Sequence, residues 1–195
     1  MYFAKNLLIT LIATCLLSSS VDAQSEKRDG LQVGDRAPNF VGVDDEDKKW
    51  DSKDKAGKKI YVVYFYPADM TPGCTRQACA YRDAVKEMTR EDVEIVGVSG
   101  DAVENHKHFK EQYELNFTLL SDSDGKIAKA FGVRTRPGGS ITRQIGDLQL
   151  TLERGVTASR WTFIIDKDWK IAHKDTQVNA IEDSERVLAE IEKLK

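Results

Sequence analysis

The chain has 195 residues, of which 41% are hydrophobic, and its formal net charge is −3. This length suits one well-buried domain and is short for two, and the scattered charges of both signs argue against a nucleic-acid-binding surface. The three cysteines, Cys15, Cys74 and Cys79, make thiol chemistry the feature to explain.

The N-terminus has the pattern of an export signal. A mostly apolar run occupies residues 6–17, and the small residues Val21 and Ala23 precede Gln24. The run is short for a membrane span, so the pattern predicts a signal peptide at residues 1–23 that is cleaved before Gln24.

Two alternatives to cleavage are an uncleaved anchor and lipidation at Cys15, although Thr14 fits poorly directly before a lipidated cysteine. Cleavage would give a periplasmic or secreted protein that is not attached to a membrane. The polar residues 24–33 are then expected to be a flexible leader, and residues 34–195 the folded domain.

The segment Ile60–Tyr66 is apolar on both faces and rich in β-forming residues, which predicts a strand inside a covered sheet. A helix is expected after it, with a buried stripe spaced i, i+3, i+4 and i+7 at Tyr81, Ala84, Val85 and Met88. Val93–Val98 predicts the next central strand.

The turn between that first strand and its helix carries a cysteine. Thr71 suits an N-cap and Pro72 the first helical position, which places Cys74 in the first turn of the helix. Unpaired N–H groups and the helix dipole favour a thiolate there, and the thiolate is the reactive form of cysteine. In an exported protein, Cys74 and Cys79 could instead form a structural disulfide.

Further along, residues 101–104 resemble a capping box, which predicts a helix through Tyr113 with His106 and His108 on its surface. A short strand is expected at Phe117–Leu120. The acidic turn at residues 122–125 then predicts the start of a helix at Lys126–Phe131.

The connection from Arg134 to Ser159 is long. Pro137–Gly139 predicts a turn and Leu148–Leu152 an exposed strand, and a surface insertion is favoured over a wall of the substrate entrance or an interface.

The remaining segments predict a hairpin of Trp161–Ile165 with Trp169–Ala172, and a last helix at residues 180–194. The expected buried face of that helix consists of Ile181, Leu188, Ile191 and Leu194. The order of elements predicts an α/β three-layer fold with a central mixed β-sheet flanked by helices.

Several motifs together resemble a known family. The spacing of Pro67, Thr71 and Cys74 is that of the peroxiredoxin active-site motif in the AhpC/TSA superfamily, and residues 73–83 look like the bacterioferritin comigratory protein, or Q-type, branch. Three further segments agree with it: Ala37–Phe40, Leu120–Gly125 with Phe131–Val133, and Arg160–Asp166.

The resemblance implies a thioredoxin-like fold and thiol-dependent reduction of peroxides, without a bound cofactor. It makes Cys74 the peroxidatic cysteine and Cys79 the resolving cysteine. It also implies that Thr71 holds the peroxide and the thiolate, that Arg160 donates charge-assisted hydrogen bonds, and that Pro67 shields the sulfur. A thioredoxin-like thiol reductant and a monomeric state are expected on the same grounds.

Helix geometry constrains the two cysteines. On a regular helix, residues five apart have Cα atoms about 8.6 Å apart, whereas a disulfide needs a separation of about 4.4–6.8 Å. Cys74 and Cys79 can therefore bond only if the first helical turns unwind.

Two other functions remain as alternatives. An exported thiol–disulfide oxidoreductase of the same fold would normally have a Cys-x-x-Cys motif, which this chain lacks. A copper carrier could use both cysteines with His173 as a third ligand, but this reading explains neither Thr71 nor Arg160.

Overall fold

The computed structural model describes residues 30–194, so the expected signal peptide at residues 1–23 lies outside the described residues. The elements in chain order are β1 (Val41–Asp44), β2 (Lys49–Asp51), the 3-10 helix η1 (Ser52–Asp54), β3 (Ile60–Phe65), α1 (Pro72–Arg90), β4 (Val93–Ser99), α2 (Val103–Tyr113), β5 (Thr118–Ser121), α3 (Lys126–Phe131), β6 (Thr135–Ile145), β7 (Leu148–Ala158), β8 (Trp161–Ile165), β9 (Ile171–Asp175) and α4 (Asp183–Glu192).

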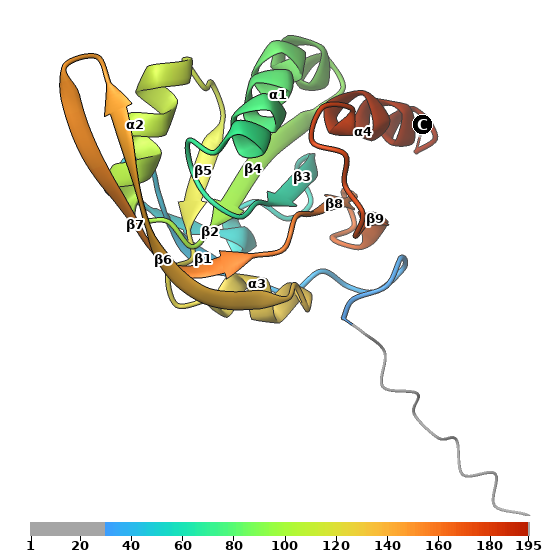
Figure 1. The fold of residues 1–195 in the computed structure, drawn as a ribbon. Helices are drawn as coiled ribbons and strands as arrows, with labels where there is room; N and C mark the ends of the chain where they lie inside the picture. Colours follow the sequence, from blue (N-terminus) through green and yellow to red (C-terminus); the bar gives the residue numbers. More distant parts are fainter. Residues whose placement is uncertain (1–29, 195) are drawn as a thin grey trace, which may run out of the picture.

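Seven strands form the central sheet in the order β2-β1-β5-β4-β3-β8-β9. The β3–β4 and β4–β5 pairs are parallel, whereas β3–β8 and the outer pairs are antiparallel. Helices α1, α2 and α4 cover one face and α3 covers the other (Figure 1). The three-layer fold with a mixed central sheet that the sequence predicted is therefore confirmed.

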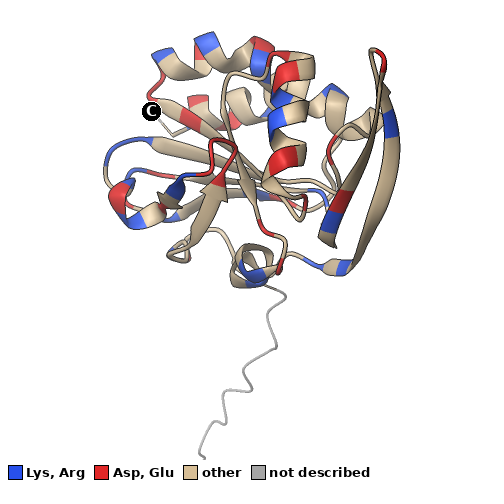
Figure 2. Cartoon of the chain, turned by 90° about the vertical axis from the view of Figure 1, so that its left-hand side faces the viewer, with Lys and Arg blue, Asp and Glu red and all other residues tan. Residues whose placement is uncertain are grey.

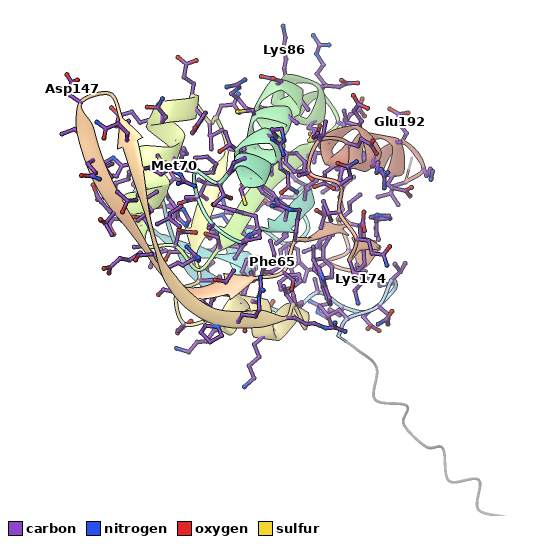
Figure 3. All side chains as sticks on the ribbon, in the orientation of Figure 1. Phe65, Met70, Lys86, Asp147, Lys174 and Glu192 are labelled. Carbon is purple, nitrogen blue, oxygen red and sulfur yellow. The ribbon has the colours of Figure 1, made fainter. Side chains whose placement is uncertain are left out.

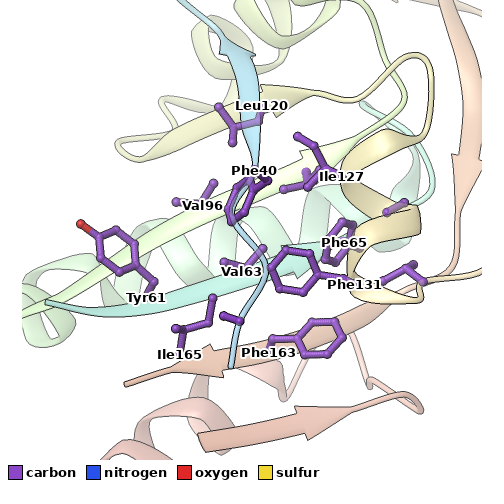
Figure 4. Close-up of a cluster of buried hydrophobic side chains, with 14 of the residues drawn as sticks. Phe40, Tyr61, Val63, Phe65, Val96, Leu120, Ile127, Phe131, Phe163 and Ile165 are labelled. Carbon is purple, nitrogen blue, oxygen red and sulfur yellow. The ribbon is translucent and has the colours of Figure 1, made fainter. Parts of the chain in front are cut away.

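Strand β3 shows why both faces of the sheet are apolar. Val62 and Tyr64 pack with the buried residues of α1, α2 and α4, while Val63 and Phe65 pack with Phe131 of α3 (Figure 4). Successive side chains of a strand point to opposite faces, so one continuous apolar strand supplies two cores. Each fully buried large apolar side chain contributes about 1.5–3 kcal/mol to the free energy of unfolding.

Leu31, within the expected leader, packs against the core on the α3 side. Within residues 30–194, no helix is both long and apolar enough to cross a membrane. Basic and acidic residues are interspersed on the face that Figure 2 shows, as the sequence indicated.

The long connection forms a separate two-stranded hairpin, β6 and β7, which projects beside α2 (Figure 1). The prediction of a turn at Pro137–Gly139 is wrong, because these residues lie within β6 and the chain reverses at Gly146 and Asp147. The base of the hairpin is held closely to the end of β4, where a Cβ on Gly100 would lie only 2.1 Å from the Val156 carbonyl oxygen.

Helix α2 differs from its prediction in two ways. The N-cap is Ala102, and the Asp101 side chain turns inward to accept a hydrogen bond from Ser99 instead of capping the helix. His106 is fully buried rather than on the surface. The tertiary partners of Asp101 and His106 outweigh the local capping pattern.

Helix α4 is also shorter and rotated relative to the prediction. Its buried stripe is Asp183, Val187 and Ile191, and Leu188 packs partly buried against the same core. Leu188 and Ile191 therefore match the predicted face, whereas Ile181 and Leu194 are exposed. The correct stripe has i, i+4, i+8 spacing, but it begins with a charged residue, which apolar periodicity does not detect.

Candidate active site

The site begins where β3 ends. A short loop leads from Tyr66 to α1, whose N-cap is Thr71 and whose first residue is Pro72, as predicted. The Thr71 hydroxyl does not cap the helix but donates to the Ala68 carbonyl at 3.0 Å. Its oxygen lone pairs are therefore left as acceptors at the start of the helix.

Cys74 lies in the first turn of α1 and is only 1% exposed. Arg160 donates from Nη2 to the Cys74 sulfur at 3.2 Å. A guanidinium and the helix N-terminus both stabilise negative charge at this position. The contact joins residues 86 apart in sequence.

The sheet register explains this contact. Strand β8 pairs antiparallel with β3, and Trp161 is opposite Phe65. Arg160 precedes β8, so it lies beside the segment that follows β3 and leads into α1.

Behind Arg160 lies a group of buried polar side chains, of which the sequence indicated only the burial of Tyr81. Arg160 donates from Nη1 to the Gln77 side-chain oxygen, and Gln77 donates to Asp183 Oδ2 at 2.6 Å. The same carboxylate oxygen accepts from Tyr81 at 2.6 Å and from Thr162 at 2.9 Å. We call Gln77, Tyr81, Thr162 and Asp183 the Asp183 cluster.

Cys79 lies five residues, or about 1.4 turns, further along α1 and is half-buried. Burial raises the pKa of its thiol, although Arg82 partly offsets this. Both cysteines are free, and α1 is continuous through them. A raised pKa lowers the fraction of the Cys79 thiol that is ionised at neutral pH.

A second buried polar group anchors the loop before α1. The backbone N–H of Asp69 donates to the Asp101 carboxylate. The Asp69 carboxylate accepts from the Tyr66 hydroxyl at 2.7 Å and lies 2.7 Å from His106 Nδ1. Burial raises the pKa of Asp101 to about 6, and the neighbouring Asp69 charge adds to the shift. Burial alone would lower the pKa of His106, but Asp69 and Asp101 outweigh it, and the pKa is raised above 6.5.

Replacing His106 with Ala should therefore lower the free energy of unfolding by about 3 kcal/mol at neutral pH, because a buried carboxylate loses its partner. The raised pKa of His106 gives a stability contribution that is present below pH 6.5 and is lost as the pH rises through the folded-state pKa. Urea unfolding from neutral to alkaline pH should show this loss in the wild type and a flatter profile in His106→Ala.

His108→Ala is the matched control for this prediction, because His108 lies on the same helix and is partly exposed, 3.8 Å from Glu104. It should change stability little at any of these pH values. Equal stability losses in the two variants would show that the buried pair does not anchor the loop.

The hairpin also reaches the site. Arg143 of β6 donates from Nε to the Met70 carbonyl at 3.0 Å, and Figure 3 shows Met70 between the hairpin and α1. Leu152 is buried, and Ile141 and Leu150 pack against the core that contains Cys74. The hairpin therefore contacts the loop before α1 and packs on the core that contains Cys74.

No group of three or more His, Cys, Asp or Glu residues within residues 30–194 is arranged to hold a metal ion. His173 lies on β9 with its ring 3.7 Å from Glu190, and the partner of the Cys74 sulfur is a cation. Because a guanidinium repels a metal cation, this arrangement argues against the copper-carrier alternative.

A cysteine in the first turn of a helix, with an arginine donating to its sulfur and a mixed sheet beneath it, is typical of thiol redox proteins of the thioredoxin-like class. The family model described as "AhpC/TSA family" matches residues 33–174. The chain therefore belongs to the AhpC/TSA family, within its peroxiredoxin Q/Bcp group.

The curated relatives include "Putative peroxiredoxin bcp" of Coxiella burnetii, which is 43% identical over 134 residues, or 67% of this chain and 88% of that protein. "Peroxiredoxin Bcp" of Bacillus subtilis is 38% identical over 141 residues, covering 72% and 82% of the two chains. The crystal structure of peroxidoxin BcpB from Mycobacterium tuberculosis superposes with a TM-score of 0.70 at 28% identity, covering 85% of this chain and 99% of that one.

Chloroplastic plant proteins are matched over a smaller part. "Putative peroxiredoxin Q, chloroplastic" of rice is 49% identical over 103 residues, which is 53% of this chain and 47% of the relative. The match thus spans about half the length of such plant relatives.

Proposed function

We propose that this protein is a thiol-dependent peroxidase that reduces hydrogen peroxide and organic hydroperoxides. The observation that carries the proposal is the Cys74 sulfur at the N-terminus of α1 with the Arg160 guanidinium 3.2 Å away. The names of the bacterial relatives, which are peroxiredoxins, support it.

In the first step the Cys74 thiolate attacks one oxygen of the peroxide. The S–O bond forms as the O–O bond breaks, and the electron pair leaves on the other oxygen, which takes up a proton as an alcohol or water. Arg160 can donate to the sulfur and to the departing oxygen, so it stabilises charge as it moves between them. Cys74 becomes a sulfenic acid.

Thr71 and Pro67 complete the proposed site. Because the Thr71 hydroxyl hydrogen is directed at Ala68, its oxygen is free to accept a hydrogen bond from the O–H group of a bound hydroperoxide. Half-buried Pro67, at the start of the loop, would limit access of water to the sulfur.

In the second step the Cys79 thiol attacks the sulfenic sulfur, forms an intramolecular disulfide and releases water. Since α1 is continuous from Pro72 to Arg90, its first turns must unwind before the two sulfurs meet. A thioredoxin-like dithiol then supplies two electrons and returns both cysteines to thiols.

Thiol counting tests this scheme. One equivalent of hydrogen peroxide should remove two thiols from the reduced wild type and leave a Cys74–Cys79 disulfide in the peptide map. Cys79→Ser should lose one thiol, gain the mass of one oxygen atom and react with a sulfenic-acid probe. It should also lose efficient cycling with thioredoxin, because no disulfide forms for the donor to reduce. Unimpaired cycling in Cys79→Ser would remove Cys79 from the mechanism.

The alternative, a thiol–disulfide oxidoreductase, is less well supported because four residues separate the cysteines and the helix between them is intact. Insulin reduction without peroxide turnover would favour it.

We further propose that the protein acts outside the cytoplasm as a monomer. The export pattern at residues 1–23 supports the location, and the peroxiredoxin Q/Bcp resemblance supports the monomer. N-terminal sequencing of the protein recovered after expression should begin at Gln24, and light scattering should give the mass of one chain. A start at Met1 or a dimer mass would overturn the corresponding part.

A further inference from the structure

The side chain of Gln77 connects two charged groups that demand opposite hydrogen-bonding partners. The Arg160 guanidinium can only donate, and the Asp183 carboxylate can only accept. The Gln77 amide meets both, with its oxygen toward Arg160 and its nitrogen toward Asp183. The orientation of the amide is therefore set by the two charges, and it positions the guanidinium that contacts Cys74.

Asp183 is the centre of these contacts. It is 2% exposed, and Gln77 and Tyr81 of α1 and Thr162 of β8 all donate to the same carboxylate oxygen. Gln77 and Tyr81 are four residues apart, so they lie on one face of α1. The first residue of α4 thus binds the second and third turns of α1.

The position of Gln77 in the chain gives this contact a second consequence. Gln77 lies between Cys74 and Cys79, in the segment that must unwind before the proposed disulfide can form. Unwinding would break its bond to Asp183. The same bond that supports Arg160 in the first step must therefore be lost in the second.

We propose that Asp183 is a positioning residue that holds Arg160 on Cys74 through Gln77 and that restrains the unwinding of α1. The catalytic consequence rests on the proposed peroxidase function. Asp183 then has opposite effects on the two steps, because it speeds formation of the sulfenic acid and slows its conversion to the disulfide. A longer-lived sulfenic acid is more open to further oxidation by a second peroxide.

Hydrogen exchange in the reduced protein tests the restraint without any peroxide. In Asp183→Ala the backbone amides of residues 75–79 should exchange at least about tenfold faster, because a charge-assisted hydrogen bond is lost. Asp183→Asn, which keeps an acceptor, should stay near the wild type. Unchanged exchange in Asp183→Ala would overturn the proposal whatever the activity of the protein.

Rapid-quench thiol trapping tests the opposite effects on the two steps. Asp183→Ala should form sulfenic acid about tenfold more slowly and convert it to disulfide faster than the wild type does. If it slowed both steps alike, Asp183 would have only a structural role. If the wild type formed no sulfenic acid, the peroxidase function would be refuted. The hydrogen-exchange experiment would still test whether Asp183 restrains the unwinding of α1.

A paired substitution keeps the test valid if Asp183→Ala does not fold. Gln77→Met keeps the length of the side chain but can neither accept from Arg160 nor donate to Asp183, which retains Tyr81 and Thr162 as donors. With Asp183→Asn, which keeps an acceptor for Gln77, as its matched partner, Gln77→Met should slow sulfenic acid formation and speed its conversion to the disulfide. Wild-type rates of both steps in Gln77→Met would contradict the positioning role.

Discussion

Cys74→Ser should consume no measurable peroxide, with a rate at least about a thousandfold below that of the wild type. A serine hydroxyl is not ionised near neutral pH and is a far weaker nucleophile than a thiolate. Its size is close to that of cysteine, so the fold and the Arg160 contact should persist. Peroxide consumption with a thioredoxin-coupled assay measures the effect.

The matched control is Cys79→Ser, which removes the other cysteine of the same helix but should still complete one turnover. Circular dichroism would verify that both variants are folded. Wild-type turnover in Cys74→Ser would place the chemistry at another residue and refute the proposed function.

Arg160→Met should slow formation of the Cys74 sulfenic acid by about 10²–10³-fold, the effect of removing a donor that stabilises developing charge. The methionine keeps much of the apolar stem but donates no hydrogen bond to the sulfur or to the departing oxygen. The rate of sulfenic acid formation in Arg160→Lys should fall between those of the wild type and Arg160→Met. A single ammonium cannot reproduce the guanidinium fork that reaches both Cys74 and Gln77. Single-turnover kinetics at low peroxide concentration measures this step directly.

Arg143→Met is the control for charge, because Arg143 also lies at the active-site loop but donates to the Met70 carbonyl rather than to the sulfur. We expect its rate of sulfenic acid formation to remain within a few-fold of the wild type. An Arg160→Met variant that reacted as fast as Arg143→Met would show that the guanidinium on the sulfur is not required.

Local sequence patterns correctly predicted those helices and strands that are specified by neighbouring residues. The apolar run of β3 and the stripe of α1 were correct, and so was the start of α3, where Asp122 accepts from the N–H groups of Ile127 and Ala128. The same kind of reasoning failed at Asp101 and His106. Their side chains form buried contacts with Asp69, which lies in a different segment of the chain. A pattern within one helix cannot indicate such contacts.

The sequence alone determined the place of Cys74. Thr71, Pro72 and Cys74 follow a buried strand directly, and the conformations that these residues favour act over one helical turn. The spacing of Cys74 and Cys79 likewise showed that the helix must open for a disulfide to form. Arg160 was reached through the family resemblance, because nothing in its immediate neighbours marks it.

Only the tertiary structure decided what surrounds that cysteine. The pairing of β3 with β8 brings Arg160 to the sulfur, and packing of α4 on α1 brings Asp183 to Gln77, 106 residues away in sequence. Backbone preferences act over a few residues, so they do not predict these contacts. A buried charge is hydrogen-bonded by the donors that the packing of helices and strands places beside it.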